Sequence, residues 1–302
     1  MTSEHRLTLM TVHAHPDDET IGVGGTMARA VADSRRVVLV TGTRGELGEI
    51  VVPEMDTPAN HHRLGEIRAG ELEAAMTELG VTEWENLGYR DSGMMGDTGN
   101  RDPRSYWQAD LDEAIGRLVW FVRQVRPDVM TTYNDFGGYG HPDHIRTHLV
   151  AVGAFARAGD PKAYPGQLAD GLEPWAPAKL YEQAMSRSQR DAMNERMIAL
   201  GRRSFWLPPE DATPEQLAEH AAFIARATVP DDAITTRIDI ADYLDQKWAA
   251  IRRHVTQISL DSPFMLLGLE GWREAWSTES YVLRESRVPA PVPETDLFAG
   301  LG

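Results

Sequence analysis

The stretch LTLMTVHAHPDDE (residues 7–19) joins a run of apolar and β-branched residues to one histidine and three consecutive carboxylates. Its first part, Leu7–Ala14, predicts a buried β-strand. His15 and the acidic residues follow where that strand ends. Carboxylates this close repel one another, and a buried carboxylate without a partner is costly. Either basic side chains or a metal ion must therefore neutralise this cluster.

The rest of the first half alternates short β-rich runs with helical patterns, in which apolar residues recur at i, i+3 and i+4. Such alternation is typical of βαβ units and of a parallel sheet. We therefore predict an α/β fold, with a Rossmann-like, mostly parallel sheet flanked by helices and a smaller C-terminal α+β region. The predicted strands are Leu7–Ala14, Val37–Thr43, Trp84–Tyr89, Asp128–Tyr133 and Lys179–Gln183, and the predicted helices are Gly24–Ser34, Arg63–Leu79 and Leu111–Val125.

Composition limits the classes of partner and metal ligand. The 302 residues carry a formal net charge of −16, so a nucleic-acid backbone is not an expected partner. No window approaches the roughly 18 apolar residues of a membrane span, and we expect a cytoplasmic protein without a membrane partner. The oligomeric state is left open. The chain has no cysteine, so His, Asp or Glu must hold any metal.

The second half has a different texture from the first. We expect a strand at Ile234–Ile238 and helices at Pro214–Ala227 and Ile240–Gln257. The tail Val288–Gly302 holds three prolines and is expected to run loose over the surface. The predicted organisation is a catalytic core at residues 1–160, followed by a region at residues 161–302 that completes the fold and shapes the substrate cleft.

A second polar cluster, Gly140-His141-Pro142-Asp143-His144, follows the predicted strand Asp128–Tyr133 and opens a helix. Ligands of open parallel sheets collect at the carboxyl ends of the strands. His141 and His144 share one face of a helical turn. If the two strands are neighbours, the pair faces His15 and Asp18. Two histidines and one aspartate around an open position form a common catalytic zinc arrangement, although iron(II) uses the same ligand set.

Each cluster also has a simpler interpretation. HPDDE alone could be a solvated turn in which Asp18 caps the next helix. The histidines of the second cluster could be ordinary exposed residues of a helix that bind no metal. The joint placement of both clusters at strand ends favours a metal site instead. A metal would lower the pKa of a water molecule bound to it, and Asp17 would accept the proton of that water as general base. Glu19 would orient a neighbouring side chain.

These stretches resemble the zinc-dependent N-acetylglucosaminyl deacetylase superfamily, the LmbE-like or PIG-L-like deacetylases. The resemblance rests on the two clusters and covers residues 7–158. Residues 41–49, 90–94 and 133–140 further resemble the mycothiol-pathway branch, which contains a deacetylase of N-acetylglucosaminyl-inositol and the mycothiol S-conjugate amidase. The family has an LmbE-like α/β catalytic core, which matches the fold predicted above.

The resemblance implies specific ligands for a metal. One zinc ion per chain would be bound by His15, Asp18 and His144, and Asp17 would act as general base. Another divalent metal such as Fe²⁺ would fit the same ligands.

The resemblance also implies the residues that handle the substrate. His141 would act as an acid or oxyanion stabiliser in its imidazolium form, oriented by Asp143, and Tyr139 would help to hold the amide oxygen. Arg68 and Asp91 would grip the hydroxyls of a sugar or inositol, although Arg68 could also be an ordinary surface residue of a helix. We expect a bell-shaped pH–rate profile with Asp17 on the acid limb and His141 on the basic limb.

The predicted function is hydrolysis of the N-acetyl amide of an N-acetylglucosaminide, a small amidosugar such as N-acetylglucosaminyl-inositol. The alternative is a mycothiol S-conjugate amidase, or a deacetylase of another glycosylated small molecule. Some conjugate amidases carry a lysine where this chain has Gly22, which argues against that alternative. More remote alternatives are a metallophosphoesterase, which needs more bridging carboxylates, and a non-catalytic sugar-binding module with a structural metal.

Overall fold

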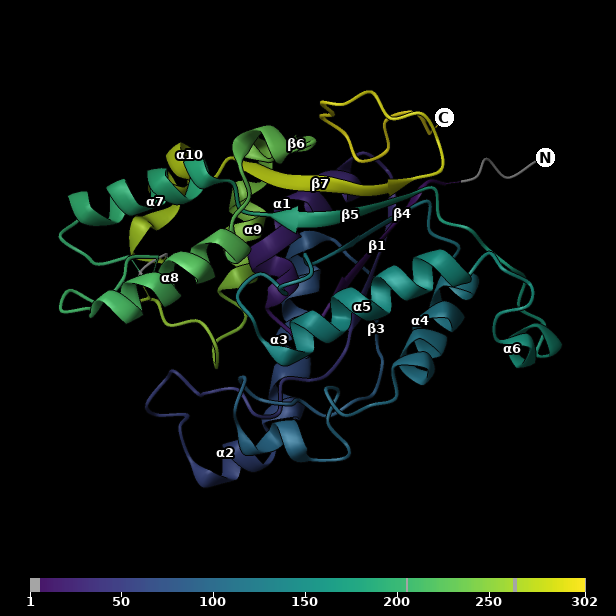
Figure 1. Ribbon diagram of the computed structural model, residues 1–302, viewed down its shortest axis with the longest axis horizontal. Coiled ribbons are helices and arrows are strands. Elements are labelled where there is room, and N and C mark those ends of the chain that lie inside the picture. Colours follow the sequence, from purple (N-terminus) through teal and green to yellow (C-terminus); the bar gives the residue numbers. More distant parts are fainter. Residues whose placement is uncertain (1–5, 205, 263–264, 302) are drawn as a thin grey trace.

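The computed structural model describes residues 6–204, 206–262 and 265–301. Within them the strands form one seven-stranded sheet in the order β3-β2-β1-β4-β5-β7-β6 (Figure 1). Strands β1 to β5 run parallel, whereas β7 is antiparallel to both β5 and β6. The predicted α/β class is therefore confirmed. The strands are β1 (Thr8–His13), β2 (Arg36–Thr41), β3 (Glu83–Asn86), β4 (Val129–Thr132), β5 (Lys179–Ala184), β6 (Thr236–Asp239) and β7 (Thr278–Ser286).

Strand β1 lies at the centre of the parallel part of the sheet and is buried along its whole length. Its Thr11 pairs with Leu39 of β2 on one side and with Thr131 of β4 on the other. Leu9 belongs to the hydrophobic core on one face of the sheet, and Met10 belongs to the core on the other. A strand covered on both faces reads as a continuous apolar run, which is why residues 7–14 predicted it so clearly.

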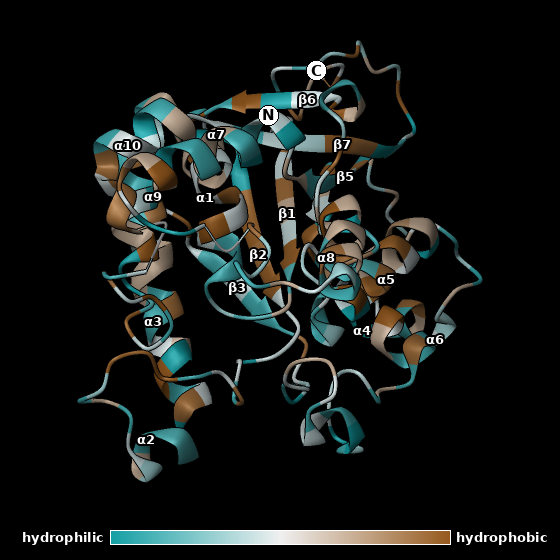
Figure 2. Ribbon diagram, turned by 60° about the vertical axis from the view of Figure 1, so that its left-hand side comes forward, coloured by the Kyte–Doolittle hydropathy of each residue, from teal (hydrophilic) through white to brown (hydrophobic). Residues whose placement is uncertain are grey.

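Helices cover both faces of the sheet. One face packs against α1 (Asp18–Ala32), α3 (Leu64–Leu79) and α9 (Leu244–Ile251), and the other packs against α4 (Leu111–Val125) and α5 (Pro142–Arg157). Figure 2 shows brown, hydrophobic residues along β1 and β2 between these layers. The remaining helices are α2 (Pro58–His62), α6 (Pro165–Ala169), α7 (Arg187–Ala199), α8 (Pro214–Ala227) and α10 (Gly268–Ala275), with 3₁₀ turns at Thr98–Arg101, Asp231–Ala233, Ala241–Tyr243 and Met265–Leu267.

The structure departs from the predicted elements mainly in the second half. The predicted helix Ile240–Gln257 is shorter, because a 3₁₀ turn precedes α9 and the helix ends at Ile251. Helix α7 and strand β7 were not predicted. Helix α7 buries only Met193 and Met197 among its thirteen residues, so it lacks a continuous apolar stripe.

The C-terminal tail packs against the sheet, and the prediction that it runs loose was wrong. Leu297 and Phe298 are buried, and the Glu294 carboxylate lies 2.5 Å from the Nζ atom of Lys179 on β5. Both charged side chains are fully buried. The folded-back tail thus supplies the charged partner that the buried ammonium of Lys179 needs.

Residues 161–302 contribute β5, β6 and β7 to the same sheet that β1 to β4 begin. In Figure 1, α7, α8 and α10 gather at one end of the molecule and α6 lies at the other. No helix in the described part of the chain is long and apolar enough to cross a membrane.

Candidate active site

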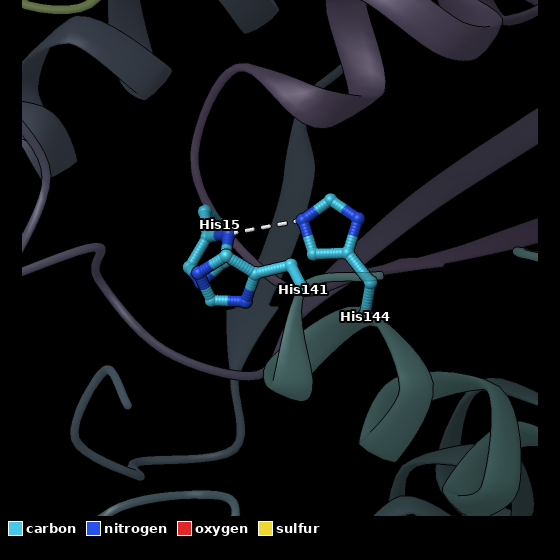
Figure 3. A group of neighbouring side chains, drawn as sticks. All are labelled: His15, His141 and His144. Carbon is cyan, nitrogen blue, oxygen red and sulfur yellow. Dashed lines mark hydrogen bonds between the residues drawn. The ribbon is translucent and has the colours of Figure 1, made fainter. Parts of the chain in front are cut away.

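The two polar clusters meet at the carboxyl ends of β1 and β4, which are neighbouring strands. His15 lies in the loop between β1 and α1, His141 caps the N-terminus of α5, and His144 lies in the first turn of α5. Figure 3 shows the three imidazole rings converging from these two segments. The side chains are buried, with His15 6% and His144 1% exposed.

His15, Asp18 and His144 form a tight triangle of possible metal ligands. The Nε2 atom of His144 lies 3.2 Å from Nδ1 of His15 and 3.3 Å from Oδ2 of Asp18. The third edge, from Nδ1 of His15 to Oδ2 of Asp18, measures 3.4 Å. Ligands about 2.0–2.1 Å from a tetrahedral zinc ion are separated by about 3.4 Å. The three predicted ligands therefore fit a zinc ion in both chemistry and spacing.

Neighbouring groups orient the three ligands toward the centre of the triangle. Nδ1 of His144 lies 3.1 Å from the Gly137 carbonyl oxygen, which can only accept a hydrogen bond, so Nε2 keeps its lone pair for a metal. Nε2 of His15 lies 3.2 Å from the Asp143 carboxylate, which leaves Nδ1 as its ligand atom. The Tyr133 hydroxyl donates to Oδ2 of Asp18 at 2.8 Å. Such outer hydrogen bonds fix the orientation of metal ligands.

His141 is an alternative third nitrogen ligand. The ligand atoms of His15, His141 and His144 all lie within 4.8 Å of one another. Although burial raises the pKa of Asp18, His144 and His15 hold that pKa well below its usual value. Asp18 would thus be an anionic ligand at neutral pH and would balance part of the charge of a divalent metal.

Asp17 is the carboxylate next to this triangle. Its backbone has φ 116° and ψ −35°, an unusual conformation for a residue other than glycine. The guanidinium of Arg68 lies 3.3 Å from Oδ2 of Asp17. Burial raises the pKa of Asp17 to about 6, although Arg68 acts to lower it. A carboxylate with this pKa is suited to accept and return a proton near neutral pH.

Arg68 is 3% exposed, so the interpretation of this residue as an ordinary surface arginine is excluded. It donates to the carbonyl oxygens of Pro16 at 2.6 Å and Gly45 at 2.9 Å. These bonds connect helix α3 to the loops after β1 and β2. Arg68 therefore holds the loop that carries Asp17, and it also lines the active-site cavity.

The structure favours a neutral His141 over the expected imidazolium. Its Nδ1 atom accepts a hydrogen bond from the backbone N–H of Asp143 at 3.1 Å, which leaves no proton on Nδ1. Burial lowers the pKa of His141 to about 2, and His15 and His144 act in the same direction. The N-terminus of α5 also disfavours a cation. The role of His141 stays a prediction, and a neutral ring would give it no basic limb near neutral pH.

The backbone N–H of Asp143 donates to His141, whereas the Asp143 carboxylate contacts Ser92 and His15. Oδ2 accepts from the backbone N–H of Ser92 at 2.9 Å and lies near His15, and Oδ1 accepts from the Ser92 hydroxyl. Residue 92 was not singled out in the sequence. A serine in a loop after β3 carries no signal of this contact, which depends on how the loop folds over α5.

Asp91 lies beside His15 of the triangle, and Tyr139 lies beside His144. The oxygens of Asp91 accept from the backbone N–H groups of Leu47 at 3.0 Å and Gly93 at 2.8 Å, and Oδ1 lies 3.7 Å from Nε2 of His15. Burial raises the pKa of Asp91, but His15 and these bonds hold it well below its usual value. The Tyr139 side chain is 44% exposed, with its hydroxyl 3.5 Å from Nε2 of His144.

A cavity of about 610 Å³ opens over this cluster. All of the predicted site residues except Asp143 line it, and Asp143 lies behind His15. Residues from the second half of the chain complete the wall, among them Gln183, Lys247 and Trp276. The cavity therefore draws on both halves of the chain.

A parallel-sheet α/β fold with a buried His–Asp cluster at the carboxyl edge of the sheet is typical of an enzyme with a metal site. Residues 10–155 match the family described as "PIG-L: GlcNAc-PI de-N-acetylase". A protein of Geodermatophilus obscurus, named 1D-myo-inositol 2-acetamido-2-deoxy-alpha-D-glucopyranoside deacetylase, is 45% identical over 100% of this chain and 99% of its own. A protein of the same name from Streptomyces avermitilis is 43% identical over 97% of each. The chain therefore belongs to the PIG-L family of de-N-acetylases.

The fold is also that of a solved family structure. The N,N'-diacetylchitobiose deacetylase of Pyrococcus horikoshii superimposes with a TM-score of 0.62 over 91% of this chain and 83% of its own, at 21% sequence identity. At this identity the likeness concerns the fold alone.

Proposed function

We propose that the protein hydrolyses the N-acetyl amide of an N-acetylglucosaminide such as N-acetylglucosaminyl-inositol, giving acetate and a free amine. The observation that carries this proposal is the triangle of His15, Asp18 and His144 beside Asp17, whose pKa is raised to about 6. The names of the full-length relatives support the choice of substrate. A cytoplasmic location is part of the proposal, and cell fractionation would test it.

The proposed metal is zinc, bound by His15, Asp18 and His144, and Fe²⁺ would suit the same ligands. Zinc, when bound there, supplies Lewis acidity for the acetyl carbonyl and for the attacking water. The hydrogen bonds of His144 to the Gly137 carbonyl and of His15 to the Asp143 carboxylate support this assignment, because they leave the other ring nitrogen of each histidine free to bind a metal.

Asp17 acts as the proton carrier in the proposed reaction. Its carboxylate takes a proton from water as the water oxygen attacks the acetyl carbon. When the C–N bond breaks, the same carboxyl returns that proton to the leaving amine. A pKa of about 6 suits both steps, and the Arg68 guanidinium at 3.3 Å holds the carboxylate in place.

His141 stabilises the oxyanion as a neutral imidazole. Because Nδ1 accepts from the Asp143 backbone, the ring proton lies on Nε2, where it can donate to the oxyanion. The hydroxyl of Tyr139, which lines the same cavity, provides a second hydrogen-bond donor. Asp143 positions His141 through the backbone and His15 through its carboxylate.

Arg68 and Asp91 are proposed to contact the hydroxyls of the sugar or inositol. Both line the cavity, and both are held rigidly by bonds to backbone groups. We also propose that residues 161–302 shape the cleft around the second ring of the substrate, with Gln183 and Trp276 on its wall.

A metallophosphoesterase is less well supported. The two groups of possible metal ligands among the described residues share His15 and His141 but no carboxylate that could bridge two metal ions. Phosphoesterases with paired metals need two centres about 3.5–4 Å apart.

The test is release of free amine by the zinc-loaded protein, measured side by side on N-acetylglucosaminyl-inositol, N-acetylglucosamine and a mycothiol S-conjugate. The Asp17→Asn variant serves as the blank. We expect preferred turnover of the inositol compound and its loss in the blank. Preference for the conjugate would establish the amidase instead. Full activity of the blank would contradict the role of Asp17, and no turnover of any compound would contradict the proposed substrate class.

A further inference from the structure

The backbone of Asp17 lies in a strained region and needs support from its surroundings. A residue other than glycine with φ 116° persists only where neighbouring contacts fix it. Its N–H donates to Oε2 of Glu19 at 3.0 Å, and its carbonyl oxygen accepts from the Thr20 hydroxyl at 2.8 Å. The side chain of Glu19 thus closes the turn from which the Asp17 carboxylate projects.

Glu19 in turn depends on a residue from the far end of the chain. Its other oxygen, Oε1, lies 3.2 Å from Nε2 of His254, which is 235 positions away in the sequence. Both side chains are fully buried. Because a carboxylate oxygen can only accept, Nε2 of His254 donates this hydrogen bond. Burial lowers the pKa of His254, whereas the hydrogen bond and charge of Glu19 raise it above its usual value.

We propose that His254 is a positioning residue for catalysis, which acts through Glu19 to fix the backbone of Asp17 and aim its carboxylate. This inference rests on the proposed function, in which Asp17 carries the proton. The path is continuous: His254 Nε2 donates to Glu19, and Glu19 accepts from the Asp17 N–H. Loss of the donor leaves Glu19 as a buried carboxylate with no charged partner, and it must reorient toward another donor or toward water.

The segment that carries His254 has anchors of its own. Thr256 donates from its backbone N–H and its hydroxyl to the two oxygens of Glu71, each at 2.7 Å. The Gln257 side chain donates to the carbonyl oxygen of Glu49 at 2.9 Å. The bond from His254 to Glu19 is therefore not needed to hold the segment after α9. Its distinct consequence is at Asp17.

The experiment compares wild-type protein with His254→Leu, which removes the donor, and with His254→Gln, which keeps one. We expect His254→Leu to lower kcat ~10- to 100-fold with little change in KM, because misplacement of a reacting group affects the chemical step. His254→Gln should recover most of kcat. The matched control is Thr256→Val, which removes a buried hydrogen bond from the same segment and should leave kcat unchanged.

A second measurement does not depend on turnover. Hydrogen exchange of peptides that span residues 14–20 should be faster in His254→Leu than in wild type, whereas exchange in helix α4 should be unchanged. Faster exchange there with unchanged kcat would overturn the catalytic role. An equal fall of kcat in Thr256→Val would also overturn it, because the effect would then be general destabilisation. If the wild type releases no amine from any substrate, the proposed function fails, and unchanged exchange at residues 14–20 would then overturn the positioning link as well.

Discussion

Burial shifts the pKa values of Asp17 and His141, two side chains of one cavity, in opposite directions. Burial disfavours the charged form of either residue. For the carboxyl of Asp17 that form is deprotonated, so the pKa rises to about 6, whereas for the imidazole of His141 it is protonated, so the pKa falls to about 2. The same physical cause thus suits Asp17 to its proposed role as proton carrier and His141 to its proposed role as a neutral hydrogen-bond donor.

The pH dependence of activity should follow Asp17. As a base, Asp17 must be deprotonated, so kcat/KM should fall as the pH drops through about 6 and should level off above it. No basic limb from His141 is expected near neutral pH, because its pKa is lowered to about 2. Steady-state rates between pH 4.5 and 8, with metal content measured at each pH, would test this. A rate that rises toward low pH would contradict the role of Asp17.

Two histidine variants should separate metal binding from substrate activation. His144→Ala should lose bound zinc, because it removes one of the three proposed ligands. His141→Ala should keep zinc but lose roughly 100-fold in kcat, as expected for removal of an oxyanion donor. Metal content by mass spectrometry and kcat on the same preparations would check this. Loss of zinc in His141→Ala would instead assign His141 as a ligand.

At the scale of elements, the glycines of α1 set how closely this helix packs against residues from the second half of the chain. A Cβ at Gly25 would lie 2.5 Å from Cδ1 of Ile240, which is fully buried and has no room to move. A Cβ at Gly22 would lie 2.4 Å from Oε1 of Gln183. Gly22 and Gly25 therefore leave the space that the side chains of Gln183 and Ile240 occupy.

Gly25→Ala should destabilise the protein by about 1–3 kcal/mol, because the added methyl overpacks a rigid contact. The control is Gly70→Ala in helix α3, where nothing lies within 4 Å of the new Cβ. That variant should raise stability by about 0.5–1 kcal/mol through helix propensity. Urea unfolding of both variants would decide, and equal stability of the two would contradict the close packing of α1.

Elements with strong local signals were predicted well, and those without them were missed. Helix α4 has the predicted bounds, Leu111–Val125, because Asp110 caps its start and its apolar residues form a continuous face. Strand β7 was missed. Its sequence, TESYVLRES, is polar at both ends, and its place in the sheet comes from pairing with β5 and β6.

At the scale of the whole molecule, a buried ion pair between Glu294 and Lys179 connects the C-terminal tail to β5 of the sheet. Glu294→Ala should destabilise the protein by about 3–5 kcal/mol, because it leaves Lys179 charged and buried without its partner. Replacement of both residues, Lys179→Met with Glu294→Leu, should recover part of that loss. The control Glu173→Ala removes an exposed partner of Arg126 and should have no measurable effect. Thermal unfolding would test the set, and a mild effect of Glu294→Ala alone would contradict the ion pair as an anchor.

The sequence by itself determined the α/β class, the parallel strands of the first half and the side chains that meet at their ends. It could do so because strand and helix periodicity are local, and the carboxyl ends of parallel strands share one edge. The tertiary structure alone decided which atoms face one another. It turned the carboxylate of Asp143 toward His15, directed the backbone N–H of Asp143 to Nδ1 of His141, and brought His254 to Glu19 across 235 positions. These contacts arise from packing between distant segments, and no local pattern encodes a partner that lies on another element.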